Sequence, residues 1–438
     1  MSGLNPGDIG QEVHRKVKVR MLAMIMAMVV LSSLDRTNIS FAALRMNQAL
    51  GLDKESFGFG ASIFFVGYLA FQIPSMMLLK KIGARRWIFL TVTVWGVLAA
   101  AMAFIQNATQ FYALRLLIGV AESGFAPGTM YYISRWLPSA YRGRSITATM
   151  LAIPVSVIIG APISGVLLGI HAVDFPGWRW MFLLEGLPTV LLGVFALFWF
   201  VDRPRDAKWL TPEEKDWVER GIAADDAEAQ ARSGAKVGWA PIMANPLIWC
   251  CAGVWFAFVT GGNGIIFWLP QAIKAIAGRG DFETSLLSAL PWVAVAIGMV
   301  VNAWRSDKIQ ERFYHVGLAA LLGAVGLIGA ALTGGGLPAL ACLVVGGLGL
   351  GACQAVYWTI PLRLLSGGQA ANGVAMINLT GNIGSLMIPT AIGFLIQRTG
   401  SFNTPIYVMA TLLMIAALLL IPIAKADRRR SAAALAAA

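Results

Sequence analysis

Long apolar segments alternate with short polar ones along almost the whole chain. A helix that crosses a bilayer needs about 20 mostly apolar residues, and segments of this kind recur twelve times. The pattern therefore predicts an all-α polytopic membrane protein with twelve transmembrane helices. The predicted spans are residues 21–44, 57–79, 86–106, 110–134, 145–170, 179–201, 246–272, 285–304, 314–333, 337–362, 370–397 and 404–424.

One connection is much longer than the others and divides the spans into six and six. Within it, Thr211-Pro212-Glu213-Glu214 begins a capped amphipathic helix, and residues 223–234 have the composition of a small-residue linker. A short basic inner loop follows the second span of each group, as expected for a duplicated unit. The predicted parts are an N-terminal tail (1–20), a first half (21–201), a linker (202–245), a second half (246–424) and a C-terminal tail (425–438).

The composition supports this class and decides how the net charge is interpreted. The chain is 58% hydrophobic and only 13% charged, with a net charge of +12. Most of its 34 lysines and arginines fall in alternate loops and in the two tails, which orients both termini toward the cytoplasm. The positive charge thus predicts how the chain is oriented in the cell membrane, which we expect to be a bacterial inner membrane. It does not predict binding of nucleic acid.

Neither a metal site nor an enzyme active site is indicated by the motifs. The four cysteines lie in apolar segments without metal-binding spacing. No nucleophile and base, and no metal cluster, occur in a pattern typical of catalysis. We therefore expect no metal, no cofactor other than a coupling ion, and no enzymatic activity.

Charged residues inside the predicted spans are the candidate chemistry. Asp35 and Arg36 lie in the first span, and Arg115 and Glu122 lie in the fourth. A charge at the bilayer centre costs roughly 2.5–3.5 kcal/mol on insertion scales, so each is a functional hypothesis. Arg115, Gly119 and Glu122 are spaced to share one helix face. We interpret the four charges as a buried pair of acids with a buried pair of arginines.

The acids and the arginines suit different tasks. Burial favours the neutral form of a carboxyl group and a nearby arginine favours the charged form, so Asp35 and Glu122 are candidates for carrying a proton. The alternative is a permanent structural ion pair. A guanidinium group matches a carboxylate in shape and charge. We interpret Arg36 as the anchor of a substrate carboxylate and Arg115 as the partner of the internal acids, and leave the reverse assignment open.

Polar residues also recur at helical spacing on otherwise apolar spans. Lipid does not solvate such stripes, so they are expected to line a water-filled cavity, although they could instead bond one packed span to another. The second half has no deep charge, which predicts recognition of hydroxyl groups or rings there. The candidate substrate contacts, besides the arginines, are Tyr68 and Gln72 in the first half and Asn263, Gln354, Trp358, Asn378 and Asn382 in the second.

The chain contains seven motifs in this order: Leu34-Asp35-Arg36-Thr37-Asn38, Phe57–Gly60, Gly83-Ala84-Arg85-Arg86-Trp87, Leu114–Pro127, Gly177–Gly186, Phe267–Pro270 and Ile377–Asn382. Together they resemble the anion:cation symporter family of the major facilitator superfamily, which includes tartrate, galactonate, glucarate and phthalate transporters. The resemblance implies the major facilitator fold, with two six-helix halves, and implies that Asp35 and Glu122 are the coupling acids.

Further residues are candidates for gating. Gly160 and Pro162 in the fifth span suit a hinge at which helices pack closely. Arg85 and Arg86 lie in the inner loop of the first half, and Asp307 lies in the equivalent loop of the second half. For Asp307 a purely structural role is the preferred alternative.

These features predict a proton-coupled symporter that takes up a small organic carboxylate by alternating access. Sugar acids, hydroxy acids such as tartrate, and aromatic acids all fit the residues. The expected partners are that anion, protons and the lipid bilayer, and a monomer suffices mechanically. The main alternative is an exchanger or uniporter that moves the anion without protons. A channel or receptor would not need duplicated halves.

Overall fold

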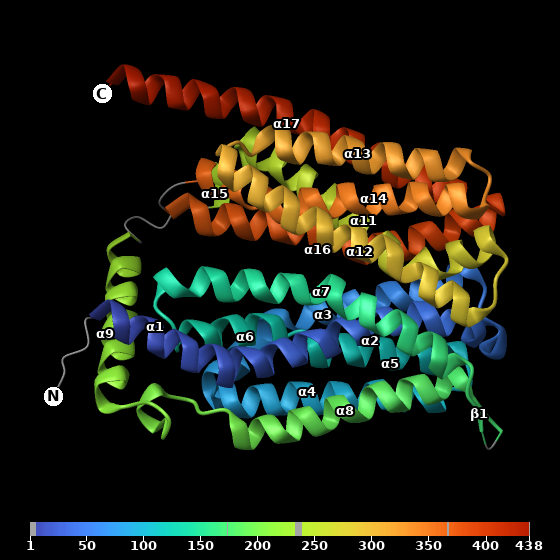
Figure 1. Cartoon of the computed structure of the whole chain (residues 1–438), viewed down its shortest axis with the longest axis horizontal. Helices are drawn as coiled ribbons and strands as arrows, with labels where there is room; N and C mark the ends of the chain where they lie inside the picture. Colours follow the sequence, from blue (N-terminus) through green and yellow to red (C-terminus); the bar gives the residue numbers. More distant parts are fainter. Residues whose placement is uncertain (1–5, 173, 233–238, 366–367, 438) are drawn as a thin grey trace. The chain divides into compact units, whose positions relative to one another are not determined.

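The computed structural model describes residues 6–172, 174–232, 239–365 and 368–437, nearly all of them helical (Figure 1). Residues of the predicted N-terminal tail form a helix that continues through one π-helical turn into the first span. The helices before the long connection are α1 (Pro6–Val17), α2 (Ala23–Leu50), α3 (Lys54–Ile82), α4 (Ala84–Ala101), α5 (Ala108–Glu122), α6 (Phe125–Ser134), α7 (Ser139–Leu168) and α8 (Gly177–Trp199).

The rest of the described chain is also helical. A two-residue antiparallel pair, β1 (His171–Ala172) and β2 (Phe175–Pro176), closes the connection between α7 and α8. The remaining helices are α9 (Pro212–Arg232), α10 (Trp239–Met243), α11 (Pro246–Ala277), α12 (Asp281–Ile309), α13 (Phe313–Leu332), α14 (Gly336–Tyr357), α15 (Thr359–Leu364), α16 (Gly368–Thr399) and α17 (Asn403–Ala437).

The predicted all-α membrane class is confirmed. Within the described ranges, 11 helices are long and apolar enough to cross a membrane. The predicted span 110–134 is not among them, because it is broken into α5 and α6, each of which is short. Counted with this broken span, the helices match the twelve predicted ones.

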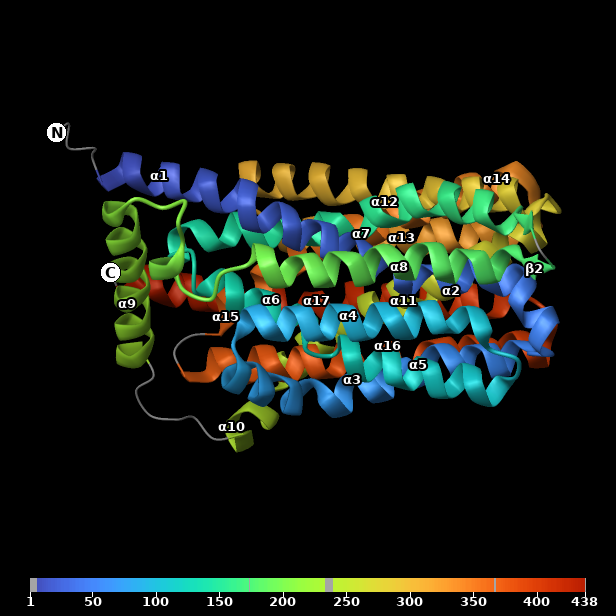
Figure 2. The same ribbon diagram turned by 90° about the horizontal axis from the view of Figure 1, so that it is seen from below.

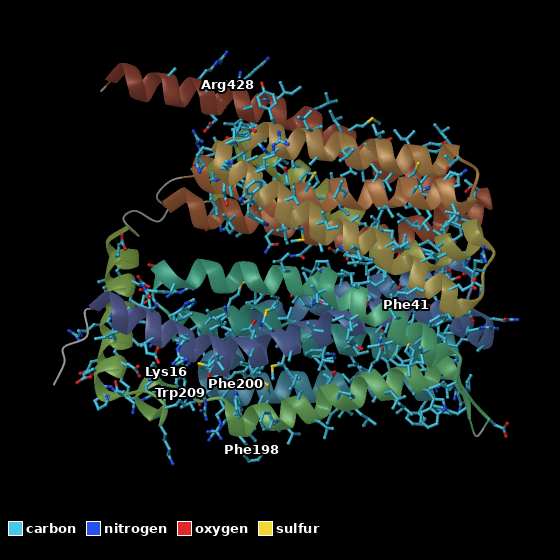
Figure 3. All side chains as sticks on the ribbon, in the orientation of Figure 1. Lys16, Phe41, Phe198, Phe200, Trp209 and Arg428 are labelled. Atoms are coloured by element: carbon cyan, nitrogen blue, oxygen red, sulfur yellow. The ribbon has the colours of Figure 1, made fainter. Side chains whose placement is uncertain are left out.

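The surface of these helices is apolar where lipid would surround it. Ile73, Phe198 and Leu418 keep 75%, 74% and 62% of their surface exposed. Figure 3 shows Phe198 pointing away from the neighbouring helices of its unit, whereas Phe200 is buried. In water such exposure would be unfavourable, but hydrocarbon solvates these side chains.

Contacts divide the chain into two compact units that cut across the long helices. The predicted domain boundaries stay a prediction, since the contact pattern reports packing and not duplication. Unit 1 comprises Met1–Arg36, Val66–Ser156 and Arg179–Ser233, and unit 2 comprises Thr37–Phe65, Val157–Trp178 and Gly234–Ala438.

In unit 1 helix α9 lies across the end of α1 (Figure 2). The predicted capping box is confirmed: the Thr211 N–H donates to Glu214 Oε2 at 2.9 Å, and the Glu214 N–H donates to Thr211 Oγ1 at 3.3 Å. Lys16 of α1 also pairs with Glu214, at 2.8 Å.

The prediction of a linker at residues 223–234 is wrong for residues 223–232, because α9 continues to Arg232. Alanine is the best helix former, so an alanine-rich acidic stretch extends a helix more readily than it ends one. Asp225 in this stretch accepts hydrogen bonds from the N–H and hydroxyl groups of Ser139, at 2.7 and 2.8 Å. Residues 233–234 lie outside the described residues.

In unit 2 the predicted outer ends of α2, α3 and α7 pack with helices of the second half. Lys54 Nζ donates to Gln271 Oε1 at 2.7 Å. Thr390 donates to Ser62 Oγ from its N–H and hydroxyl groups, at 3.1 and 2.8 Å. A Cβ at Gly165 of α7 would lie 2.9 Å from Ser285 Cβ of α12, so these helices are in close contact.

Tyr132 ties α6 to the end of α8 and provides a test of the packing in unit 1. Its hydroxyl group donates to the Val201 carbonyl at 2.7 Å and accepts from the Val201 N–H at 3.2 Å, and Tyr132 is buried. We expect Tyr132→Phe to lower the free energy of unfolding by about 1–3 kcal/mol, because both Val201 groups lose their partner. Tyr407→Phe, at a half-exposed position, is the control. Equal melting temperatures for the two variants in detergent would contradict this role.

Candidate functional site

Glu122 is the centre of the charged cluster in unit 1. It is the last residue of α5, and none of its surface is exposed. The Ser32 hydroxyl group of α2 donates to Oε1. Arg36 Nε lies 3.1 Å from Oε1 and 3.2 Å from Oε2, and its Nη2 lies 3.1 Å from Oε1. One turn of α2 therefore holds the carboxylate of α5 with a neutral donor and a charged one.

Asp35 and Arg115 complete the cluster. They are 7% and 2% exposed. Arg115 is attracted by Asp35 most strongly, next by Glu122, and is repelled by Arg36. The structure thus brings together the four charges that the sequence singled out, with attractive interactions that link α2 and α5.

The two arginines differ in exposure. Arg115 is almost fully enclosed, whereas one third of the Arg36 side chain, 33%, is exposed. The Arg36 guanidinium group also lies 5.3 Å from the centre of the Tyr68 ring on α3, a cation–π contact. Arg36 is therefore held by an acid and an aromatic ring, while part of its side chain stays exposed.

The break in the fourth span lies directly after Glu122. Because α5 ends there and α6 begins at Phe125, Ser123 and Gly124 form the junction. Trp87 Nε1 of α4 donates to the Gly124 carbonyl at 3.1 Å, and the Ser75 and Ser123 hydroxyl groups bond to each other at 2.7 Å. The break is therefore supported by two neighbouring helices.

Sequence reasoning missed this break and Ser32. Ser-Gly followed by Pro127 was the available signal for the break, because these residues weaken a helix. Ser32 lies three and four residues before Asp35 and Arg36, a spacing that places all three on neighbouring positions of one helix face. Gln72, one turn after Tyr68, is half-buried on α3.

The second-half candidates lie on α11, α14 and α16, in unit 2. Asn263 Nδ2 donates to Ser385 Oγ and to the Val259 carbonyl, each at 3.0 Å. Gln354 Nε2 lies 3.5 Å from the Phe258 carbonyl, at the limit of a hydrogen bond. Asn263 therefore joins α11 to α16, and Gln354 lies against α11.

The aromatic candidate Trp358 belongs to a cluster of rings. It follows Tyr357 at the junction of α14 and α15 and contacts Trp255 edge to face, with ring centres 4.8 Å apart. Trp255 also stacks on Tyr357 at 5.2 Å. On α16, Asn378 is exposed and Asn382 is half-buried.

Among the gating candidates in the first half, Arg85 donates its N–H to Asp202 Oδ1 at 2.9 Å and its side chain to the Leu197 carbonyl, so it holds the end of α8. Arg86 is exposed. Gly160 and Pro162 lie within α7. Their gating roles stay predictions.

In the second half, Asp307 pairs with Arg312 of its own loop at 2.6 Å, a contact that suits a structural role. Neighbouring Glu311 receives the N–H groups of Tyr314 and His315 at the start of α13. Burial raises the pKa of Glu311, but these donors and the His315 ring outweigh it, and the pKa lies below its ordinary value. The end of α12 and the start of α13 thus hold two acids, each beside a basic side chain.

Membrane-spanning helices that enclose a cluster of paired charges are typical of a polytopic membrane transporter. A sequence profile described as Major Facilitator Superfamily matches residues 25–389. The chain therefore belongs to this superfamily. Proteins of this family are multi-pass membrane transporters and not enzymes.

Two relatives and one solved structure support this assignment. A protein of Agrobacterium vitis named as a candidate tartrate transporter is 40% identical over 427 residues, which cover 97% of this chain and 94% of the relative. A quinolone resistance transporter of Acinetobacter baumannii is 33% identical, with 97% and 98% covered. An inward-facing, unoccupied bacterial homologue of the human lysosomal transporter Spinster superposes with a TM-score of 0.76 at 18% identity, covering 94% and 97%. The predicted family resemblance and fold are confirmed.

Gly124 offers a test of the break beside Glu122. A Cβ at this position would collide with the Trp87 ring and lie 2.9 Å from Ser75 Cβ. We expect Gly124→Ala to destabilise the protein by about 1–3 kcal/mol through overpacking and to reduce transport by displacing Glu122. Gly261→Ala is the matched control, because its Cβ would find its nearest neighbour at 3.7 Å. Wild-type melting temperature and transport in Gly124→Ala would contradict the role of the break.

Proposed function

We propose that this transporter is a symporter that takes up a small organic carboxylate together with protons. The observation that carries the proposal is the pairing of fully buried Glu122 with Arg36, whose side chain is one third exposed. In such a pair, Arg36 can exchange the Glu122 carboxylate for the carboxylate of a substrate. Small molecule transport follows from the superfamily, whereas proton coupling and the carboxylate are our proposal.

Protonation and anion binding are linked through Arg36. While Glu122 is ionised, its carboxylate occupies the guanidinium group. A proton on Glu122 removes that negative charge and leaves Arg36 with an uncompensated positive charge, which attracts the carboxylate of a substrate. The proton and the anion therefore favour each other's binding, as symport requires.

Alternating access would use this linkage in sequence. With the outer ends of the helices apart, Glu122 takes up a proton and Arg36 binds the anion. The outer contacts of unit 2, such as Lys54 with Gln271, then form and close that side. Loss of the proton to the cytoplasm restores the Glu122–Arg36 pair, which competes with the anion and expels it. One chain contains all these parts, so a monomer suffices.

The substrate class is inferred from both halves and from the relatives. The Arg36 fork suits a carboxylate. The second-half candidates Asn263, Gln354 and Trp358 carry amides and a ring of the kind that suits hydroxyl groups or a ring, and their contact with the substrate stays a prediction. The name of the Agrobacterium relative points to tartrate. Hydroxy acids and sugar acids are therefore the first substrates to test, and aromatic acids follow.

Glu122→Gln tests proton coupling. Glutamine keeps the shape of the protonated acid but cannot release a proton. In proteoliposomes with an alkaline interior, we expect wild-type protein to accumulate labelled tartrate or galactonate. We expect Glu122→Gln to lose this accumulation by at least about tenfold and to retain counterflow between equal pools, because counterflow needs no net proton release.

Glu283→Gln, whose side chain is 55% exposed on α12, controls for the loss of an acid elsewhere. Wild-type uptake that is saturable but independent of the pH gradient would instead establish the exchanger or uniporter.

Arg36→Ala tests the anchor in a thermal-shift panel of carboxylates on purified protein. A ligand that binds the folded protein raises its melting temperature. Charged hydrogen bonds contribute about 1.5–3 kcal/mol, so we expect the variant to bind roughly 10- to 150-fold more weakly. Arg279→Ala, at a side chain that is 64% exposed, should bind like wild type. Equal binding by Arg36→Ala would transfer the anchor role to Arg115.

A further inference from the structure

Ser32 is a buried hydroxyl group, 7% exposed, that contacts the proposed proton carrier. We propose that Ser32 is a positioning residue that holds the Glu122 carboxyl group in both protonation states, so that, of its two hydrogen-bond partners, only Arg36 is released by the proton. This inference rests on the proposed function, because it assumes that Glu122 carries the coupling proton.

The hydrogen bonds distinguish the two carboxylate oxygens. Oε1 receives the Ser32 hydroxyl group and also Arg36, through Nε at 3.1 Å and Nη2 at 3.1 Å. Oε2 receives Arg36 Nε at 3.2 Å. Since Oε1 has the larger share of the donors, Oε2 is the oxygen that accepts the proton, and Oε1 becomes the carbonyl oxygen of the neutral acid.

Ser32 and Arg36 then respond differently to that proton. A serine hydroxyl group is neutral and can donate to a carboxylate oxygen or to the carbonyl oxygen of a carboxylic acid. Its bond to Oε1 therefore survives protonation. The attraction between Arg36 and Glu122 depends on opposite charges, and it falls when one charge disappears. Ser32 keeps the acid in place while Arg36 becomes available to the substrate.

We expect the other titratable groups near Glu122 to stay in place when Ser32 is changed, because each belongs to a helix that Ser32→Ala leaves intact. Asp35 and Arg36 belong to α2, Tyr68 to α3 and Arg115 to α5, and the last three interact with Glu122 electrostatically. On α4, Arg86 is exposed, and Arg85 bonds to the α8 end of unit 1. An effect of changing Ser32 thus reports on its hydroxyl group.

The experiment is the pH dependence of uptake in proteoliposomes for Ser32→Ala, Ser32→Thr and wild type. A hydrogen bond is stronger to a charged acceptor, so loss of the Ser32 donor favours protonated Glu122. We expect the pH of half-maximal uptake to rise by about 0.5–1 unit in Ser32→Ala. Ser32→Thr keeps a hydroxyl group and should restore the wild-type midpoint. Half-maximal tartrate concentration at low pH should change less than about threefold, because the substrate anchor is intact.

Ser40→Ala is the control, because Ser40 is fully buried on the same helix but its hydroxyl group bonds to the Thr37 carbonyl at 2.6 Å. An unchanged midpoint in Ser32→Ala, with pH-dependent wild-type uptake, would overturn the role of Ser32. Uptake by the wild type that does not depend on pH would reject the proposed function itself. If Ser32→Ala does not fold, Ser32→Cys, of similar size and a weak donor, decides by the same midpoint.

Discussion

A carboxylate with no exposed surface, Glu122, is the constraint on which the first half depends. An isolated ion at such a place is strongly disfavoured, and even a paired one loses several kcal/mol of hydration. The Ser32 hydroxyl group and the Arg36 guanidinium group of α2 replace that hydration. This requires α2 and α5 to meet at one register, so the position of both helices follows from the charge they enclose.

The position of Glu122 at the end of α5 adds a second electrostatic effect. The C-terminus of a helix carries partial negative charge, which disfavours an anion in the last turn. Glu122 is the last residue of α5, and the break after it is held by Trp87 and by the pair of Ser75 and Ser123. The helix end thus repels the carboxylate charge while Arg36 attracts it. Under the proposed function, the carboxyl group placed between these two effects is the one that takes up and releases the proton.

Much of the fold could be predicted, because a membrane imposes one length and one composition on each span. The four charged residues inside the spans could be predicted too, because each is energetically unfavourable there and therefore stands out in the sequence. Their pairing could not, because spacing along one helix does not tell which arginine meets Glu122. Ser32 was not predicted, because a serine in a span costs little free energy and carries no charge that would distinguish it. The break escaped because the apolar pattern of residues 110–134 continues through it.

Under the proposed function, the difference in exposure between the two arginines favours Arg36 as the substrate anchor. Arg115 is enclosed and attracted chiefly by Asp35, so moving it to a substrate would strand a buried acid. Arg36 can leave Glu122 at no such cost if a proton takes its place.

The charge balance of the four groups is consistent with the same division of tasks between Arg36 and Arg115. With all four groups ionised, the cluster is neutral, and each proton taken up leaves one positive charge. Under the proposed function, one proton therefore matches one carboxylate of the substrate. A dicarboxylate such as tartrate would need a second proton, on Asp35, and so would also release Arg115. The number of coupled protons should thus follow the number of carboxylates bound, and the second acid and the second arginine supply the means.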